Sequence, residues 1–336
     1  VVGGHPHVTQ GADLVAGRTP PEIAGLAYRE FVATELAAIE SVAARTHWSR
    51  RLADVPLPWW AGTPRGRTRR LAFELGGDEA ARLQRLAREL GVQEKSVFAA
   101  AHLALQSLLS GQADIVASAV THCRPEREGA ESALGLFLNS LPLRVSLHGS
   151  TWASLIRDTD RTQLEDETHK HYPLARIQAD TGLDFSASLF TYVNFGDDIG
   201  GSGEVEVLVD ESLDVTNYLF ASEVAKDEAG HRWRVSVVAE DTVFDEMFLA
   251  RIVDYYRNVI AAMLADNQAC IDHHALLGQA EVRQQLEVWN ATAHPFDREL
   301  CIHTWFERQV ASTPEAIALV YEGRSLSYVE LDRRAN

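Results

Sequence analysis

The hydrophobic positions of the chain repeat with helical spacing in several long stretches. Apolar residues three and four positions apart predict helices over 26–52, 78–90, 94–109, 151–167 and 245–265. Asp78 and Asp245 stand at the starts of two of these helices, where an aspartate side chain caps free backbone N–H groups. Gly91 and Gly111 follow two others, and glycine at that position ends a helix.

A second group of segments has the spacing of strands. The clearest lies within 135–147, where every second residue is apolar, namely Leu141, Leu143, Val145 and Leu147. Further strands are predicted over 70–75, 115–120, 188–195, 205–209, 218–225 and 233–240. Strands outnumber crossover helices late in the chain, so a doubly wound parallel sheet fits poorly. We expect an α/β fold of the α+β sandwich type, with a mixed sheet covered by helices.

Two stretches indicate boundaries between parts of the chain. Prolines and glycines punctuate 56–66, with a run of arginines beside them, and 290–297 has the composition of a linker. After the linker, a helix over 303–310, a strand over 317–321 and a helix from Tyr328 are too short to bury a core of their own. The chain begins at Val1 and stops inside this last helix, so we expect it to be an excerpt of a longer polypeptide.

Composition narrows the classes of partner. The chain has 31 Lys and Arg against 48 Asp and Glu, a net charge of −17, which argues against nucleic acid as the main partner. No apolar run approaches the ~20 residues that span a bilayer, so no membrane is expected. The three cysteines, Cys123, Cys270 and Cys301, lie far apart, which predicts reduced thiols in a cytoplasmic protein.

Common catalytic and metal-binding motifs are missing from the sequence. There is no GxSxG, no GxxxxGK[ST] and no HExxH, so a generic hydrolase, a kinase and a zinc protease lack support, and no metal is expected. His5 and His7 lack a third ligand nearby. His273 and His274 are adjacent as in the acyltransferase signature HHxxxDG, but the aspartate before Gly278 is missing. A pair of polar residues at a helix end is therefore favoured over a catalytic pair.

Several ordered motifs resemble the condensation domains of nonribosomal peptide synthetases. THCRPE (121–126) followed by LGLFLNSLPLRV (134–145) resembles the family's "GRP … GxFxNTLPLR" region. HYPLARIQ (171–178), the strand over 185–195, and YREF (28–31) with Trp48 resemble the segments around it. VWNAT (288–292) and LSYVEL (326–331) are similar to the linker and the first motif of an adenylation domain.

The resemblance implies a fold and a division of the chain. Condensation domains pair two lobes, each related to chloramphenicol acetyltransferase, around a tunnel. Residues 1–66 would be the end of the N-terminal lobe with a connector, and 67–275 the C-terminal lobe. Residues 276–300 would be the linker and 301–336 the truncated start of an adenylation domain.

The resemblance also implies a reaction and its partners. In this family a donor and an acceptor, each thioesterified to the phosphopantetheine arm of a carrier protein, enter the tunnel and an amide forms between them. The domain itself binds no cofactor. The proposed base is the second histidine of HHxxxDG, which is not in this chain, so we expect the isolated chain to be inactive and name no catalytic residue in it.

Six residues of this chain are candidates for the tunnel or for the interface between lobes. Arg124 matches the arginine thought to pair with the motif's aspartate, although a surface loop arginine is an equal alternative. Asn139 and Ser140 are placed to bind a pantetheine amide or, equally, to form a strand end. His171 would shape a loop at the lobe interface, and Tyr192 and Asn194 would face the tunnel from one strand.

Three functions remain open from the sequence. The first is amide formation as part of a peptide synthetase. The second is a non-catalytic platform of the same fold that binds carrier proteins or tailoring enzymes. The third, an epimerising or ester-forming relative, is disfavoured because the start of an adenylation domain follows directly.

Overall fold

The computed structural model describes residues 28–63, 66–127, 130, 133, 135–194, 217–227, 232–295 and 300–336. The chain divides into two compact units, Val1–Gly278 and Gln279–Asn336. The strand predicted over 205–209 lies outside the described residues.

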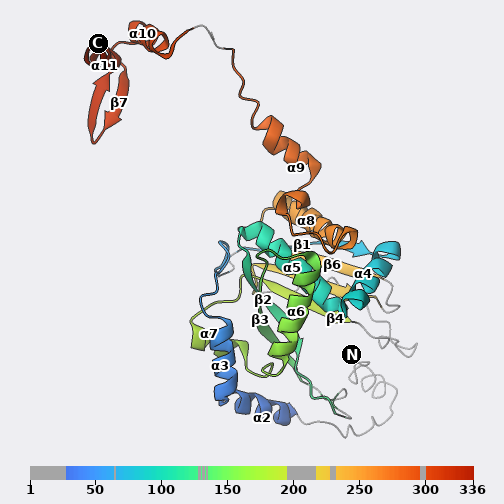
Figure 1. Ribbon diagram of the computed structural model, residues 1–336. Coiled ribbons are helices and arrows are strands. Elements are labelled where there is room, and N and C mark those ends of the chain that lie inside the picture. Colours follow the sequence, from blue (N-terminus) through green and yellow to red (C-terminus); the bar gives the residue numbers. More distant parts are fainter. Residues whose placement is uncertain are drawn as a thin grey trace. The chain divides into compact units, whose positions relative to one another are not determined.

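The first unit is built on one mixed sheet of six strands (Figure 1). The strands are β1 (Thr68–Leu75), β2 (Asp114–His122), β3 (Leu138–Ser146), β4 (Leu189–Asn194), β5 (Phe220–Lys226) and β6 (Trp233–Glu240), in the spatial order β1-β6-β5-β4-β2-β3. The pairs β2–β4 and β4–β5 are parallel and the other three pairs are antiparallel. The predicted mixed sheet is therefore confirmed.

Four helices contribute to the main core with this sheet. They are α4 (Gly77–Leu90), α5 (Glu94–Ser110), α6 (Trp152–Glu167) and α8 (Glu246–Ala265). Every residue of α5 from Ser96 to Ser107 is buried, because α5 packs on the sheet and is flanked by α6 and α8, which also pack on it (Figure 1). The helical spacing predicted this helix, and the structure buries it on more than one face.

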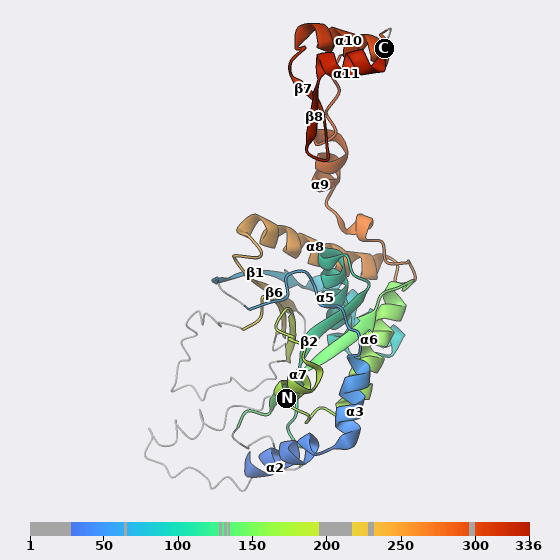
Figure 2. The same cartoon turned by 90° about the vertical axis from the view of Figure 1, so that its left-hand side faces the viewer.

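A smaller core holds three further helices against β2 and β3. The long helix predicted over 26–52 is two helices, α2 (Tyr28–Ile39) and α3 (Val42–Arg51), because Ser41 leaves the helical conformation and accepts the Ala44 N–H at 3.2 Å. Trp48 of α3 is 1% exposed and packs with Leu141 of β3 and with Ile177 of α7 (Leu174–Thr181). Figure 2 shows α3 running beside α6.

Of the two predicted helix caps, Asp245 is confirmed and Asp78 is wrong. Asp245 caps α8 by accepting the Phe248 N–H at 2.7 Å. Asp78 does not cap α4, because that helix already begins at Gly77 with Gly76 as its N-cap. Asp78 therefore lies in the first turn, where its charge suits the positive end of the helix dipole.

The second unit is a short run of helices and one hairpin. It comprises α9 (Gln279–Arg283), the π-helical turn η2 (Gln284–Val288), α10 (Ile302–Ser312), β7 (Ile317–Tyr321), β8 (Arg324–Ser327) and α11 (Tyr328–Ala335). β7 and β8 pair antiparallel across a turn at Glu322 and Gly323, both with positive φ. Ser327 and Glu330 form a capping box at the start of α11.

Candidate functional site

The residues that resemble the family motifs gather around one loop. β2 and β3 form a hairpin whose ladder ends with His122 opposite Leu138. The residues between them, 123–137, are called the motif loop below. Part of this loop forms a small buried core with α2, made of Phe31, Cys123, Ala130, Ala133 and Phe137.

Arg124 binds its own loop. Its Nη1 donates hydrogen bonds to the carbonyl oxygens of Ala130 and Ala133, both at 2.6 Å. Its guanidinium carbon lies 4.2 Å from the centre of the Phe137 ring, a cation–π contact. Arg124 therefore holds the motif loop closed. Its pairing with an aspartate from the HHxxxDG motif stays a prediction, since that motif is not in this chain.

Asn139 joins β3 to the segment that follows α6. Its Nδ2 donates to the carbonyl oxygens of Lys170 and Tyr172, both at 2.9 Å. Its Oδ1 accepts the N–H groups of Ser140 at 2.9 Å and Leu174 at 3.3 Å. Both donor hydrogens and both acceptor positions of the amide are engaged, so the side chain fixes the 170–174 segment. A contact of Asn139 or Ser140 with pantetheine stays a prediction.

Two imidazoles flank this segment and the motif loop. His171 is half-buried, with its ring 6.0 Å from that of Phe31. Burial, and secondly the charge of Lys170, lowers the pKa of His171. Burial and the neighbouring Arg124 lower the pKa of His122. Both rings are therefore biased toward the neutral form, which can accept a proton or a hydrogen bond.

Tyr192 lies in a different place from Arg124, on the sheet face that α5 covers. Its ring is 6.1 Å from that of Phe98, and its hydroxyl accepts the Trp233 Nε1–H at 3.2 Å. The hydroxyl donates to Glu94 Oε2 at 3.3 Å, and Lys226 Nζ lies 2.6 Å from the same oxygen. Burial raises the pKa of Tyr192 to about 12.

Asn194 ends the same strand, opposite Lys226 in the ladder, and its side chain lies outside the described residues. The structure therefore brings Arg124, Asn139, Ser140 and His171 to one region around the motif loop. Tyr192 belongs to a separate cluster with Glu94. The prediction that Tyr192 and Asn194 face a tunnel stays untested.

Arginines at two places in the first unit pair with carboxylates of the chain itself. Arg144 donates to both carboxylate oxygens of Asp114 and to the carbonyl oxygens of Arg51, the last residue of α3, and Ala53. Arg69 pairs with Glu246 at 2.9 Å, and Arg70 pairs with Glu223. Carboxylates of the chain itself therefore neutralise Arg69 and Arg70, two members of the arginine run beside residues 56–66. Arg65 lies outside the described residues.

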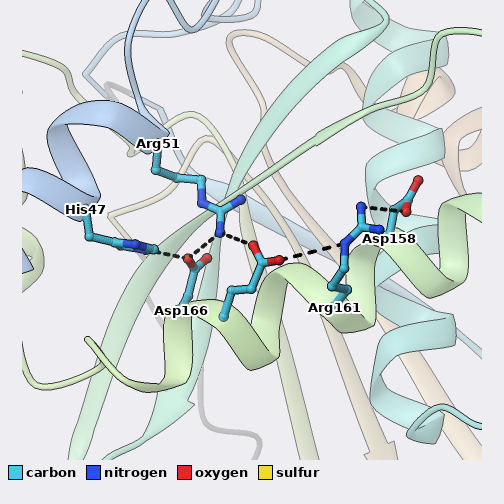
Figure 3. A network of polar contacts seen from close by, with 6 residues as sticks. His47, Arg51, Asp158, Arg161 and Asp166 are labelled. Carbon is cyan, nitrogen blue, oxygen red and sulfur yellow. Dashed lines mark hydrogen bonds and ion pairs between the residues drawn. The ribbon is translucent and has the colours of Figure 1, made fainter.

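The sequence did not reveal a polar network that ties α3 to the end of α6 (Figure 3). His47 Nε2 lies 2.7 Å from Asp166 Oδ1, and Arg51 Nη2 lies 3.0 Å from the same oxygen. The network borders a cavity of about 690 Å³ lined by His47, Arg50, Arg51, Asp114, Arg144, Ser146 and Glu165. The partners are more than a hundred residues apart in sequence, so no local motif could have indicated them.

The adjacent histidines at 273 and 274 lie in a short, capped helical turn. His273 and His274 form a one-turn 3₁₀ helix capped by Asp272, which accepts the His274 N–H at 2.9 Å. His5 and His7 lie outside the described residues. Among the residues that the structure describes, no cluster of three or more metal-ligating side chains occurs, and no helix is long and apolar enough to cross a membrane.

Comparison with known proteins connects this geometry to a family. The sequence profile of the family "Condensation domain" matches residues 11–286. The chain is 28% identical to surfactin synthase subunit 2 of Bacillus subtilis (strain 168) over 340 residues, which cover 96% of the chain and 9% of that protein. It is 30% identical to malpibaldin synthetase of Mortierella alpina over 308 residues, covering 86% of the chain and 6% of the relative.

Solved structures agree with the fold. The crystal structure of the first condensation domain of the CDA synthetase superposes with a TM-score of 0.65 at 20% identity, over 79% of this chain and 60% of that one. The chain spans less than a tenth of the length of the two synthetases above. The profile match over most of the chain and the common fold show that this chain belongs to the condensation domain family of nonribosomal peptide synthetases.

Proposed function

We propose that this chain is the larger part of a condensation domain that forms an amide between two carrier-bound substrates. The acceptor's amine attacks the donor's thioester carbonyl, a C–N bond forms and the C–S bond breaks. The amine gives up a proton and the departing sulfur gains one, so the donor's pantetheine leaves as a thiol. A base near the amine assists this transfer, and we place that base in an HHxxxDG motif outside residues 1–336.

The observation that carries this proposal is the position of Arg124. Its guanidinium is fixed by two carbonyl oxygens of the motif loop and by the ring of Phe137. A guanidinium held in this way presents a charged group without a further loss of side-chain freedom, which suits an ion pair with the motif's aspartate.

The proposal includes partners and neighbours. The substrates arrive on phosphopantetheine arms of donor and acceptor carrier proteins, and the domain binds no cofactor of its own. We assign residues 1–66 to the end of the N-terminal lobe and the connector, 67–275 to the C-terminal lobe, and 276–300 to the linker. Residues 301–336 would begin an adenylation domain, and the synthetase would act in the cytoplasm.

The test uses the complete synthetase that contains this segment. Donor and acceptor carrier domains are loaded, and the amide product is followed by mass spectrometry. We expect wild type to form the amide and Arg124→Ala to lower the rate at least tenfold. Arg161→Ala is the matched control, because Arg161 is 67% exposed on α6 and pairs with Asp158 of the same helix.

The outcomes separate the two functions. An Arg124→Ala rate and melting curve equal to those of wild type would remove Arg124 from the site. Carrier binding without any amide product from wild type would favour the non-catalytic platform. Residues 1–336 alone are expected to form no amide, and turnover by this piece would contradict the placement of the base.

A further inference from the structure

We propose that Tyr28 on α2 is a positioning residue that fixes the position of the motif loop, and with it Arg124, through a contact with Gly135. The inference rests on the proposed function, because it concerns how Arg124 is held for amide formation. Tyr28 and Gly135 are 107 positions apart in sequence, and they meet where α2 crosses the end of the motif loop.

The first support is the space at Gly135. A Cβ atom at this position would overlap the Cδ2 and Cε2 atoms of the Tyr28 ring. The backbone of Gly135 has φ of 152°, a conformation that residues with a side chain rarely adopt. The ring of Tyr28 therefore occupies the volume that the missing side chain leaves open.

The second support is the hydrogen bond beside this contact. The Tyr28 hydroxyl donates to the Leu136 carbonyl oxygen at 3.1 Å. The Tyr28 ring also meets the Phe137 ring edge-on, with centroids 5.3 Å apart. A single side chain thus contacts three successive residues, which fixes both the position and the direction of the backbone there.

The third support is the continuity from this contact to Arg124. Phe137 is 2% exposed and packs against Phe31 of α2 at a centroid distance of 5.0 Å. Phe137 also contacts Arg124, whose guanidinium carbon lies 4.2 Å from the centre of the Phe137 ring. A shift of residues 135–137 would therefore move the ring on which the guanidinium rests.

A further ion pair joins the same two segments. Arg127 of the motif loop lies 2.7 Å from Glu30 of α2, with both side chains about half exposed. An exposed pair of this kind contributes little, about 0 to 1 kcal/mol. We therefore assign the positioning to Tyr28 and treat Glu30 as secondary.

The experiment compares four variants of the complete synthetase with wild type. Tyr28→Ala removes the ring, Tyr28→Phe keeps the ring and removes the hydrogen bond, and Gly135→Ala forces the ring away. Leu36→Ala is the control, since Leu36 lies two turns along the same helix and is 60% exposed. The readouts are the single-turnover rate of amide formation, the carrier-protein Kd, and amide hydrogen exchange of residues 124–137.

A positioning role predicts a specific pattern. Tyr28→Ala and Gly135→Ala should lower the rate at least tenfold and speed exchange in the motif loop, with carrier Kd unchanged. Tyr28→Phe should lie between Tyr28→Ala and wild type, and Leu36→Ala should match wild type. A variant that merely unfolds would be recognised by faster exchange throughout the sheet. In that case the rate and the motif-loop exchange of Tyr28→Phe decide whether Tyr28 has a positioning role.

Two results would overturn the inference. One is unchanged exchange in 124–137 for Tyr28→Ala. The other is faster exchange there with a wild-type rate, which would make the contact structural. Failure of the proposed function looks different, because wild type itself would form no amide, and the inference would fall with it.

Discussion

His47 Nε2 lies 2.7 Å from the Oδ1 of Asp166, a carboxylate whose side chain is only 5% exposed (Figure 3). Burial raises the pKa of Asp166, and the charge of Arg51 opposes this shift. Arg51 also contacts Glu165 at 2.7 Å, so two side chains of α3 grip the last turn of α6. This contact joins the smaller core around Trp48 to the main core.

We expect loss of the Asp166 carboxylate to weaken the fold more than loss of either partner. Asp166→Ala removes two interactions and leaves the Arg51 charge partly buried, so the free energy of unfolding should fall by about 3 kcal/mol. His47→Ala should cost about 1 to 2 kcal/mol. Urea unfolding of each variant measures these differences, and the reverse order would refute the assignment.

The matched control is Arg161→Ala on the same helix. Arg161 contacts Asp158 at 2.8 Å and Glu165, at the edge of the same network, at 3.8 Å, but it is 67% exposed. Exposed pairs contribute about 0 to 1 kcal/mol, so this variant should unfold almost like wild type.

A second prediction concerns pH and His102, which is fully buried on α5. Its Nδ1 lies 2.8 Å from Ser222 Oγ, its Nε2 lies 2.7 Å from Ser188 Oγ, and its ring stacks on Phe220. Burial lowers the pKa of His102 from 6.5 to about 3. The unfolded chain therefore binds a proton between these values that the folded protein does not.

The sign of the effect follows from this difference. The stabilisation from His102 is complete above pH 6.5 and is lost as the pH falls toward 3, by about 1.4 kcal/mol per pH unit. The free energy of unfolding, measured between pH 4 and 7, should show this slope. His102→Gln should flatten it, and an equal slope in this variant would mean that other groups are responsible.

A third prediction tests the hydrogen bonds by which Asn139 fixes the 170–174 segment. Asn139→Ala leaves the carbonyl oxygens of Lys170 and Tyr172 without these hydrogen bonds. We expect the free energy of unfolding to fall by about 2 to 3 kcal/mol, because part-buried polar groups lose their partners. Ser140→Ala is the neighbouring control and should change stability by about 0.5 kcal/mol or less. Thermal unfolding distinguishes the two variants. Equal melting temperatures would count against a stabilising role of the Asn139 hydrogen bonds.

A fourth prediction concerns the thiols. Cys123 is buried, and burial raises the pKa of its thiol to about 12, whereas Cys270 and Cys301 are exposed. A thiolate is the reactive form, so a maleimide at pH 8 should label Cys270 and Cys301 in the native protein and Cys123 only after unfolding. Mass spectrometry of tryptic peptides reads this out, and rapid native labelling of Cys123 would contradict its burial.

The sequence indicated elements whose signals are local. The alternation from Leu141 to Leu147 predicted β3 because one face of that strand is buried, and Asp245 predicted the start of α8 because its side chain caps that helix. The signal failed where a single residue changed the outcome. Ser41 split the expected long helix, and α4 began one residue before Asp78.

The candidate site divided in the same way. Motif residues placed Arg124, Asn139 and His171 together, since they share one family pattern. Their partners were not predictable, because Asn139 binds main-chain atoms of residues 31 and 33 positions away, and backbone carbonyls leave no mark in a sequence. The resemblance implied that Tyr192 and Asn194 face a tunnel from one strand, but nothing in the sequence indicated that Tyr192 lies against Phe98 of α5.

The order of the strands has a consequence for synthesis on the ribosome. Among the described strands β1 pairs with β6 alone, so Thr68 waits for Glu240, whereas β4, β5 and β6 can each add in turn to a strand that has already been made. At about 5 to 20 residues per second, the wait lasts roughly 10 to 30 seconds. During that time β1 is a nascent edge that lacks its β6 neighbour, open to chaperones and to pairing with other chains.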